Sequence, residues 1–204
     1  MSTRLKICGI TNPQDAAGCV ELGVDLLGFN FYSGSPRYIS FQESQAIIQE
    51  IPSTTKSVGI FVRPKRTDVS EAISQSGVDL VQLFEPEDFS DYAEISVPVI
   101  IVNRITEPMS LNFELNGAAM ILLDTYTSGE LGGSGEVFDW SLIPDSIPRD
   151  RLVLAGGITP ENVQRAIDQV NPAVIDVASG AEISPGIKDL AKVKRLVEIV
   201  KGNS

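Results

Sequence analysis

Short apolar runs rich in β-branched residues recur along the chain, and polar segments with helical spacing separate them. A short apolar run bounded by turn residues is typical of a buried strand, whereas apolar positions spaced to fall on one face indicate an amphipathic helix. On this basis the sequence predicts strands at residues 4–8, 25–30, 57–62, 79–83, 97–102, 119–123, 151–155 and 173–177.

The predicted helices fall between these strands. They cover residues 13–22, 41–50, 67–75, 160–170 and 188–201, with weaker or shorter segments at 86–94, at 108–115 and around Trp140. Asn12 before Pro13 and Thr159 before Pro160 each place a capping side chain ahead of a proline that suits a first helical turn.

Regular alternation of strands and helices indicates a parallel sheet, and eight such units predict closure into a (β/α)₈ TIM barrel. The chain has 204 residues, which is near the lower end for that fold, so we expect residues 1–204 to form one domain. The sequence contains neither a membrane-spanning run nor a secretory signal pattern, which predicts a cytoplasmic protein without a membrane partner.

Composition narrows the chemistry. The formal net charge of −11 argues against a nucleic-acid surface, which needs clustered Lys and Arg. An anionic ligand remains compatible with this charge if the site supplies positive charge locally. The chain has two cysteines, Cys8 and Cys19, and no histidine, which fits neither a disulfide scaffold nor a zinc site. Acid–base chemistry must then come from Asp, Glu, Cys, Lys or Tyr.

Polar side chains stand at the C-terminal ends of several predicted strands, which form the functional face of a parallel barrel. Alternate residues of a strand point to the same side, so Lys6 and Cys8 project together. The same alternation predicts further inward residues on later strands: Gln82, Phe84, Asn103, Asp124 and Asp176.

Cys8 ends its strand beside a cation, which can lower a thiol pKa from its free value of about 8.5. We therefore expect Cys8 to take part in chemistry, with Lys6 as a further catalytic candidate, and Cys19 to be a buried core residue. Asp124 precedes a glycine-rich loop, which favours a functional carboxylate over one that only accepts loop amides. Asp176 and Gln82 either contact a ligand or satisfy one another inside the barrel.

Two glycine-containing stretches, LAGGITPEN and DVASGAEISPG, follow the seventh and eighth predicted strands. Glycines let backbone N–H groups approach an anion, and the N-termini of the following helices add a favourable dipole. Barrels often bind phosphate at these two loops, so we expect a phosphate-bearing ligand. Arg37, in YSGSPRYIS, is either a solvated loop residue or a fork for a carboxylate or second anion.

These stretches resemble the phosphoribosylanthranilate isomerases of tryptophan biosynthesis. The matching segments KICGIT, GFNFYSGSPRYIS, VGIFV, VQL, LLDTYTSGELGGSGEVFDW, LAGGITPENV and DVASGAEISPGIKD run in order from residue 6 to residue 189. The resemblance implies an isomerase without cofactor or metal. It would convert N-(5-phosphoribosyl)anthranilate into 1-(2-carboxyphenylamino)-1-deoxyribulose 5-phosphate by an Amadori rearrangement.

The resemblance also implies roles for individual residues. By the match to KICG, Cys8 is the general base that removes the proton from the second sugar carbon, and by the match to LLD, Asp124 is the general acid that protonates the ring oxygen. Arg37 would hold the anthranilate carboxylate. The phosphate would be held by Gly156, Gly157, Ser179 and Gly180, and the other expected substrate-binding residues are Lys6, Gln82 and Asp176.

One segment, VQLFEPE, departs from the family's common V-Q-L-H-G and puts Phe84 and Glu85 where His and Gly are expected. Phe84 keeps a flat apolar face for an aromatic ring, but any polar contact of the histidine is lost. The change keeps two alternatives open: another sugar-phosphate isomerase or lyase, and a non-catalytic barrel that binds a phosphate ligand. The sequence predicts a monomer or a homodimer.

Overall fold

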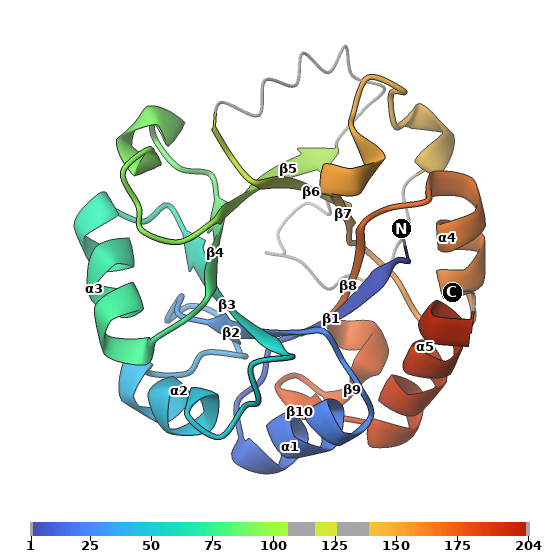
Figure 1. Ribbon diagram of the computed structural model, residues 1–204, viewed down its shortest axis with the longest axis horizontal. Helices are drawn as coiled ribbons and strands as arrows, with labels where there is room; N and C mark the ends of the chain where they lie inside the picture. Colours follow the sequence, from blue (N-terminus) through green and yellow to red (C-terminus); the bar gives the residue numbers. More distant parts are fainter. Residues whose placement is uncertain (1, 106–116, 126–138, 203–204) are drawn as a thin grey trace.

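Parallel strands close into a barrel with helices on its outer side (Figure 1). The computed structural model describes residues 2–105, 117–125 and 139–202. The strands pair in chain order and the last pairs with the first. They are β1 (Arg4–Cys8), β2 (Leu26–Asn30), β3 (Lys56–Val62), β4 (Leu80–Phe84), β5 (Val99–Ile105), β6 (Met120–Thr125), β7 (Leu152–Leu154) and β8 (Val174–Val177). The predicted fold class is confirmed.

The helices follow the predicted order. They are α1 (Pro13–Glu21), α2 (Phe41–Ile48), α3 (Arg66–Ser76), α4 (Val163–Val170) and α5 (Leu190–Gly202), together with the 3₁₀ helices η1 (Phe89–Tyr92), η2 (Trp140–Leu142), η3 (Arg149–Arg151) and η4 (Ser179–Ala181). The weak segments at 86–94 and around Trp140 are η1 and η2, and the segment at 108–115 lies outside the described residues. None of the described helices is long and apolar enough to cross a membrane.

Both predicted capping side chains accept backbone hydrogen bonds. The Asn12 side chain accepts a hydrogen bond from the backbone N of Asp15 at 2.8 Å and so caps α1. Thr159 also caps as predicted, because its Oγ1 accepts from the backbone N of Glu161 at 3.2 Å and its carbonyl O accepts from the backbone N of Val163 at 3.0 Å. Only the bound differs, since a turn at 160–162 leads into α4, which begins at Val163. In that turn Asn162 Oδ1 accepts from the backbone N of Thr159 at 2.9 Å, which uses a capping residue to shape the loop.

Two further strands, which the sequence did not predict, form a hairpin between β8 and α5. β9 (Glu182–Ser184) and β10 (Ile187–Lys188) pair antiparallel. Gly186 in the connection has φ +83, a conformation that favours glycine. Lys188, expected at the start of the last helix, therefore belongs to the hairpin, and α5 starts at Leu190.

Apolar side chains pack in two layers, because neighbouring residues of each strand point to opposite sides. The interior of the barrel is filled by Leu26, Val58, Ile60, Phe84, Ile100, Val102, Met120, Leu122, Val153 and Val174. The outer layer, between strands and helices, includes Leu5, Ile7, Leu27, Ile121, Leu154 and Ile175. Most long strands thus bury both faces.

This alternation corrects the expectation for Asn103. Ile100 and Val102 lie inside the barrel, and β5 continues to residue 105, so Arg104 shares their side and Asn103 does not. Arg104 stands opposite Asp124 in the β5–β6 register. The inward side chain at the end of β5 is therefore the cation Arg104 and not the amide Asn103.

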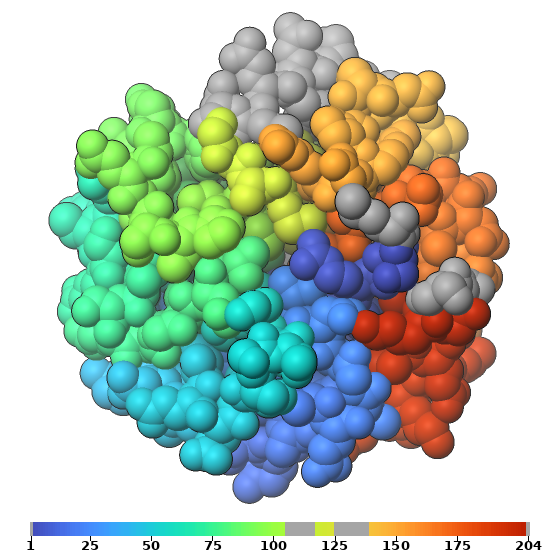
Figure 2. Space-filling model, in the orientation of Figure 1, coloured from blue at the N-terminus to red at the C-terminus, as the bar shows by residue number. Residues whose placement is uncertain are grey.

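The C-terminal ends of all the barrel strands lie on one side of the barrel. In Figure 2 the first described residues, coloured dark blue, lie near the centre of the face toward the reader. Because β1 starts there and all the paired barrel strands are parallel, the C-terminal ends of the strands lie toward the far face.

Candidate active site

A cavity of about 490 Å³ opens at the C-terminal ends of the strands. Its lining includes most of the residues predicted from the sequence, namely Cys8, Arg37, Gln82, Phe84, Asp124, Gly156, Gly157, Asp176 and Ser179. It also includes residues that sequence reasoning missed: Asn30, Tyr32, Ser35 and Ile60. Asn30 and Ile60 are inward residues on β2 and β3, so strict alternation from Leu26 and Val58 could have found them.

Cys8 and Asp124 face this cavity from strands that are not neighbours. Cys8 is the last residue of β1, which pairs with β2 and β8. Asp124 stands on β6, which pairs with β5 and β7. A thiol and a carboxyl group on separate walls can reach different atoms of one small ligand, which suits general acid–base catalysis.

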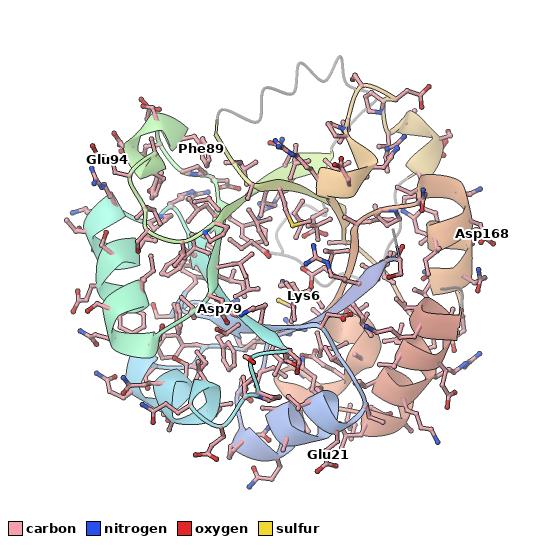
Figure 3. All side chains as sticks on the ribbon, in the orientation of Figure 1. Lys6, Glu21, Asp79, Phe89, Glu94 and Asp168 are labelled. Atoms are coloured by element: carbon pink, nitrogen blue, oxygen red, sulfur yellow. The ribbon has the colours of Figure 1, made fainter. Side chains whose placement is uncertain are left out.

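Lys6 lies beneath the cavity and not in it. Its side chain is 0% exposed, and Figure 3 shows it within the ring of strands. Its Nζ donates to Gln82 Oε1 at 3.0 Å and to Asp176 Oδ2 at 2.8 Å. Burial lowers the pKa of Lys6, but Asp176 and Cys8 raise it by more, so Lys6 remains a cation. The structure thus differs from the expected substrate contact and gives Lys6 a supporting position.

The pKa of the Cys8 thiol is raised above its ordinary value. Burial is the largest cause and Asp176 adds to the rise, while the cations Lys6, Lys188 and Arg37 oppose it. The predicted effect of Lys6 on the thiol is therefore right in sign, but the predicted net lowering of the pKa is wrong. At neutral pH most of the thiol is protonated in the ligand-free protein.

Asp176 presents one carboxylate oxygen to Lys6 and retains another. Its Oδ2 accepts from Lys6, and its Oδ1 is buried with no hydrogen-bond partner in the part of the chain that the structure describes. A buried carboxylate oxygen without a donor is unfavourable. Asp176 also lines the cavity, so its carboxyl group borders the space that a ligand would fill.

The loop after β2 holds Arg37 at the cavity. Asn30 Oδ1 accepts from the backbone N of Tyr32 at 3.0 Å, and Ser35 Oγ accepts from the backbone N of Arg37 at 3.1 Å. The Arg37 side chain is 13% exposed, and its Nε and Nη2 donate to Glu182 at 3.0 and 2.8 Å. The interpretation of Arg37 as a solvated loop residue is therefore wrong.

Gly9 makes room for this arginine. It has φ +80, and a Cβ at this position would lie 2.5 Å from Cδ of Arg37. Glycine is thus required both for the backbone conformation and for the close passage of the Arg37 side chain.

The glycines after β7 and β8 serve different purposes. Gly156 and Gly157 line the cavity with φ +85 and +63. Gly180 does not line it; a Cβ there would lie 2.0 Å from the carbonyl O of Ile158, so this glycine allows the two loops to pack. The short helix η4 begins at Ser179, just after β8 and in the cavity lining, whereas a turn at 160–162 separates the glycines after β7 from α4.

Phe84 forms an apolar wall that is backed by a cation. Its ring lines the cavity, and Cζ of Arg104 lies 5.5 Å from the ring centroid. The next residue, Glu85, has φ +49, a conformation that favours the glycine seen in the resembling sequences. Arg63 Nε and Arg104 Nη1 donate to Glu85 at 2.7 and 2.8 Å and hold this residue in place.

The cavity's acidic and thiol groups are spread over separate strands. Among residues 2–105, 117–125 and 139–202, no group of three or more Cys, Asp or Glu side chains is arranged to hold a metal ion.

Sequence comparisons point to one family. Residues 5–199 match the family model described as N-(5'phosphoribosyl)anthranilate (PRA) isomerase. The N-(5'-phosphoribosyl)anthranilate isomerase of Pseudomonas fluorescens Pf0-1 is 40% identical over 98% of this chain and 99% of the relative. The isomerase of Nitrosospira multiformis is 42% identical over 95% of this chain and 94% of the relative.

Solved structures give the same result. The phosphoribosyl anthranilate isomerase of Thermotoga maritima superposes with a TM-score of 0.87 at 40% identity, covering 98% of this chain and 99% of that one. A phosphoribosyl anthranilate isomerase in complex with reduced 1-(o-carboxyphenylamino)-1-deoxyribulose 5-phosphate superposes with a TM-score of 0.85 at 39% identity and the same coverage.

Proposed function

Because the chain belongs to the N-(5'-phosphoribosyl)anthranilate isomerase family, we propose how its own residues carry out that family's reaction. The protein is an isomerase of tryptophan biosynthesis that converts the aminoaldose N-(5-phosphoribosyl)anthranilate into the aminoketose 1-(2-carboxyphenylamino)-1-deoxyribulose 5-phosphate. The observation that supports the residue assignment is the cavity that Cys8 and Asp124 line from separate walls.

Asp124 acts first, as the general acid. It donates a proton to the furanose ring oxygen while the bond from that oxygen to C1 breaks and the nitrogen lone pair forms a C1=N double bond. The position of Asp124 on β6, on the wall away from β1, supports this assignment. The product of the step is an open-chain, positively charged Schiff base.

Cys8 then acts as the general base. Its thiolate removes the proton from C2, and the C2–H electron pair forms a C1=C2 double bond as the C=N bond electrons return to nitrogen. The resulting enolamine tautomerises to the aminoketone. A thiolate with a raised pKa is a strong base that is scarce at neutral pH, so the rate should depend on the ionised fraction.

The remaining wall residues position the substrate. The Gly156–Gly157 loop and Ser179 hold the phosphate, Phe84 stacks on the anthranilate ring, and Arg37 binds the anthranilate carboxylate. Asp176 accepts a hydrogen bond from a sugar hydroxyl at Oδ1, which has no hydrogen-bond partner among the described residues. Lys6 keeps Gln82 and Asp176 in place from below. Gly180 acts indirectly, through the packing of the phosphate loops.

We further propose that residues 1–204 form one domain that acts in the cytoplasm as a monomer or homodimer. Closure of the ring by β1 and β8 supports a single domain. One solved relative consists of monomers generated from the dimeric Thermotoga maritima isomerase, which supports both oligomeric states. Light scattering after size-exclusion chromatography would distinguish them.

The assignment is tested by following anthranilate fluorescence with freshly made phosphoribosylanthranilate, corrected for its spontaneous breakdown. We expect rapid decay with the wild type, and background decay with Cys8→Ala or Asp124→Asn. Cys19→Ala is the matched control, because Cys19 is buried in the outer core and away from the cavity lining. A Cys8→Ala protein of unchanged rate and intact fold would overturn the role of Cys8.

A further inference from the structure

A buried charge cluster lies behind Arg37. Glu182 in β9 is 3% exposed and accepts from Arg37 Nε and Nη2, and from Lys188 Nζ at 2.6 Å. The backbone N of Gly186 also donates to Glu182, at 3.1 Å. Lys188 is 0% exposed at its side chain and donates from the same Nζ to the carbonyl O of Cys8 at 2.5 Å. The cluster therefore joins the end of β1, the loop after β2 and the β9–β10 hairpin.

Glu182 is ionised in this cluster. Burial raises its pKa, but the hydrogen bonds and charges of Arg37 and Lys188 lower it by more, so the net pKa is below its ordinary value. A bidentate pair between Arg37 and an ionised Glu182 alone would have no net charge. A second carboxylate approaching Arg37 would then meet repulsion from Glu182 that offsets much of the attraction to the guanidinium.

Lys188 changes this balance. Its ammonium shares the single negative charge of Glu182, which leaves Arg37, Glu182 and Lys188 with a net charge of plus one. The neighbouring charges do not cancel it: Asp15 accepts from the backbone N of Lys188 at 2.8 Å, and Lys192 Nζ donates to the carbonyl O of Glu182 at 2.8 Å. These two bordering groups are opposite in sign.

We propose that Lys188 is a specificity-determining positioning residue: by neutralising Glu182, it keeps the charge of Arg37 effective toward the substrate carboxylate. This inference rests on the proposed role of Arg37. Lys188 is buried and does not line the cavity, so it acts through Glu182 and not by touching the substrate. Glu182 fixes the orientation of the guanidinium, and Lys188 offsets the repulsion that the Glu182 charge would exert on the substrate carboxylate.

The test compares two ligands that differ only in the carboxylate. One is reduced 1-(o-carboxyphenylamino)-1-deoxyribulose 5-phosphate, and the other is the same compound made with aniline in place of anthranilic acid. Calorimetric titration gives the two dissociation constants. The constant of the aniline compound divided by that of the carboxylate compound is the carboxylate ratio, which measures how much the carboxylate contributes to binding. The ratio is measured for the wild type, Lys188→Gln, Glu182→Gln/Lys188→Gln and Arg37→Met.

We expect Lys188→Gln to reduce the ratio by about tenfold, because the charge of Glu182 then repels the ligand carboxylate. A tenfold change corresponds to about 1.4 kcal/mol, which is the size of a lost charge-assisted hydrogen bond. The double variant removes both charges and should restore the ratio to within about threefold of wild type. A purely structural role of Lys188 predicts instead that both ligands weaken equally and that the double variant recovers nothing.

An unchanged ratio in Lys188→Gln, equal weakening of both ligands, or a double variant no better than the single one would overturn the inference. If Lys188→Gln fails to fold, the double variant alone tests the inference. A ratio in the double variant far below that of the wild type would then contradict it. Arg37→Met separates the two levels. If it leaves the ratio unchanged, the proposed role of Arg37 fails; if only Lys188→Gln leaves it unchanged, the inference alone fails.

Discussion

The ammonium of Lys6 and the carboxylate of Asp176 form a buried ion pair of 2.8 Å beneath the floor of the active site. Lys6 has no exposed surface, and Asp176 both pairs with it and lines the cavity. The pair thus connects the stability of the barrel interior to the chemistry above it, since the same two charges shift the pKa of Cys8 in opposite directions.

Replacing Lys6 should destabilise the fold and impair catalysis. Lys6→Met leaves Asp176 as a buried charge without its partner, which typically costs about 3–5 kcal/mol of unfolding free energy. Urea denaturation measures this cost. Lys56→Met is the matched control: it breaks an exposed pair with Asp79, and we expect a change below about 1 kcal/mol. Equal losses in the two variants would contradict the structural role of Lys6.

The pH dependence of kcat/KM should follow ionisation of Cys8. The base is the thiolate and its pKa is raised, so activity should increase as pH rises from neutral toward alkaline values and decrease as pH falls. Removing the cation in Lys6→Met should move this limb to higher pH, because Lys6 lowers the thiol pKa. A stopped-flow fluorescence profile from neutral to alkaline pH checks both statements. A flat profile would remove Cys8 from the base role.

The aromatic face of Phe84 should contribute to substrate binding and not to the chemical steps. Phe84→Leu keeps an apolar wall but loses the ring, so we expect KM to rise about two- to tenfold with kcat nearly unchanged, as for a lost aromatic contact. Phe84→His keeps a planar ring and should retain more of the affinity. A fall in kcat with unchanged KM in Phe84→Leu would show a different role.

Gly180→Ala should separate the two phosphate loops. A Cβ at this residue would lie 2.0 Å from the backbone O of Ile158, and backbone cannot move aside cheaply. We expect a loss of about 1–3 kcal/mol of stability and weaker inhibition by inorganic phosphate, from overpacking of the loop contact. Gly202→Ala, where a Cβ meets nothing within 4 Å, is the control, and thermal unfolding with phosphate inhibition assays gives both readouts.

Periodicity predicted the barrel and several of the side chains that line its cavity. The inward positions of Cys8, Gln82, Asp124 and Asp176 follow from a repeat of two residues along a strand, which each segment carries by itself. Asn103 does not point inward as predicted, because the side to which a residue points depends on the alternation along the whole strand, and β5 extends past its apolar run to Ile105. Periodicity also missed the hairpin β9–β10, which is too short to show a pattern.

The sequence by itself determined the fold class, the order of the barrel strands and most of the side chains at their ends. These properties depend on neighbours within a few residues of one another. Only the tertiary structure decided the surroundings of those side chains: Glu182 reaches Arg37 across 145 residues of sequence, and Lys188 reaches Cys8 across 180. The net pKa of Cys8 was decided there too, because burial and distant charges have no local signature in the sequence.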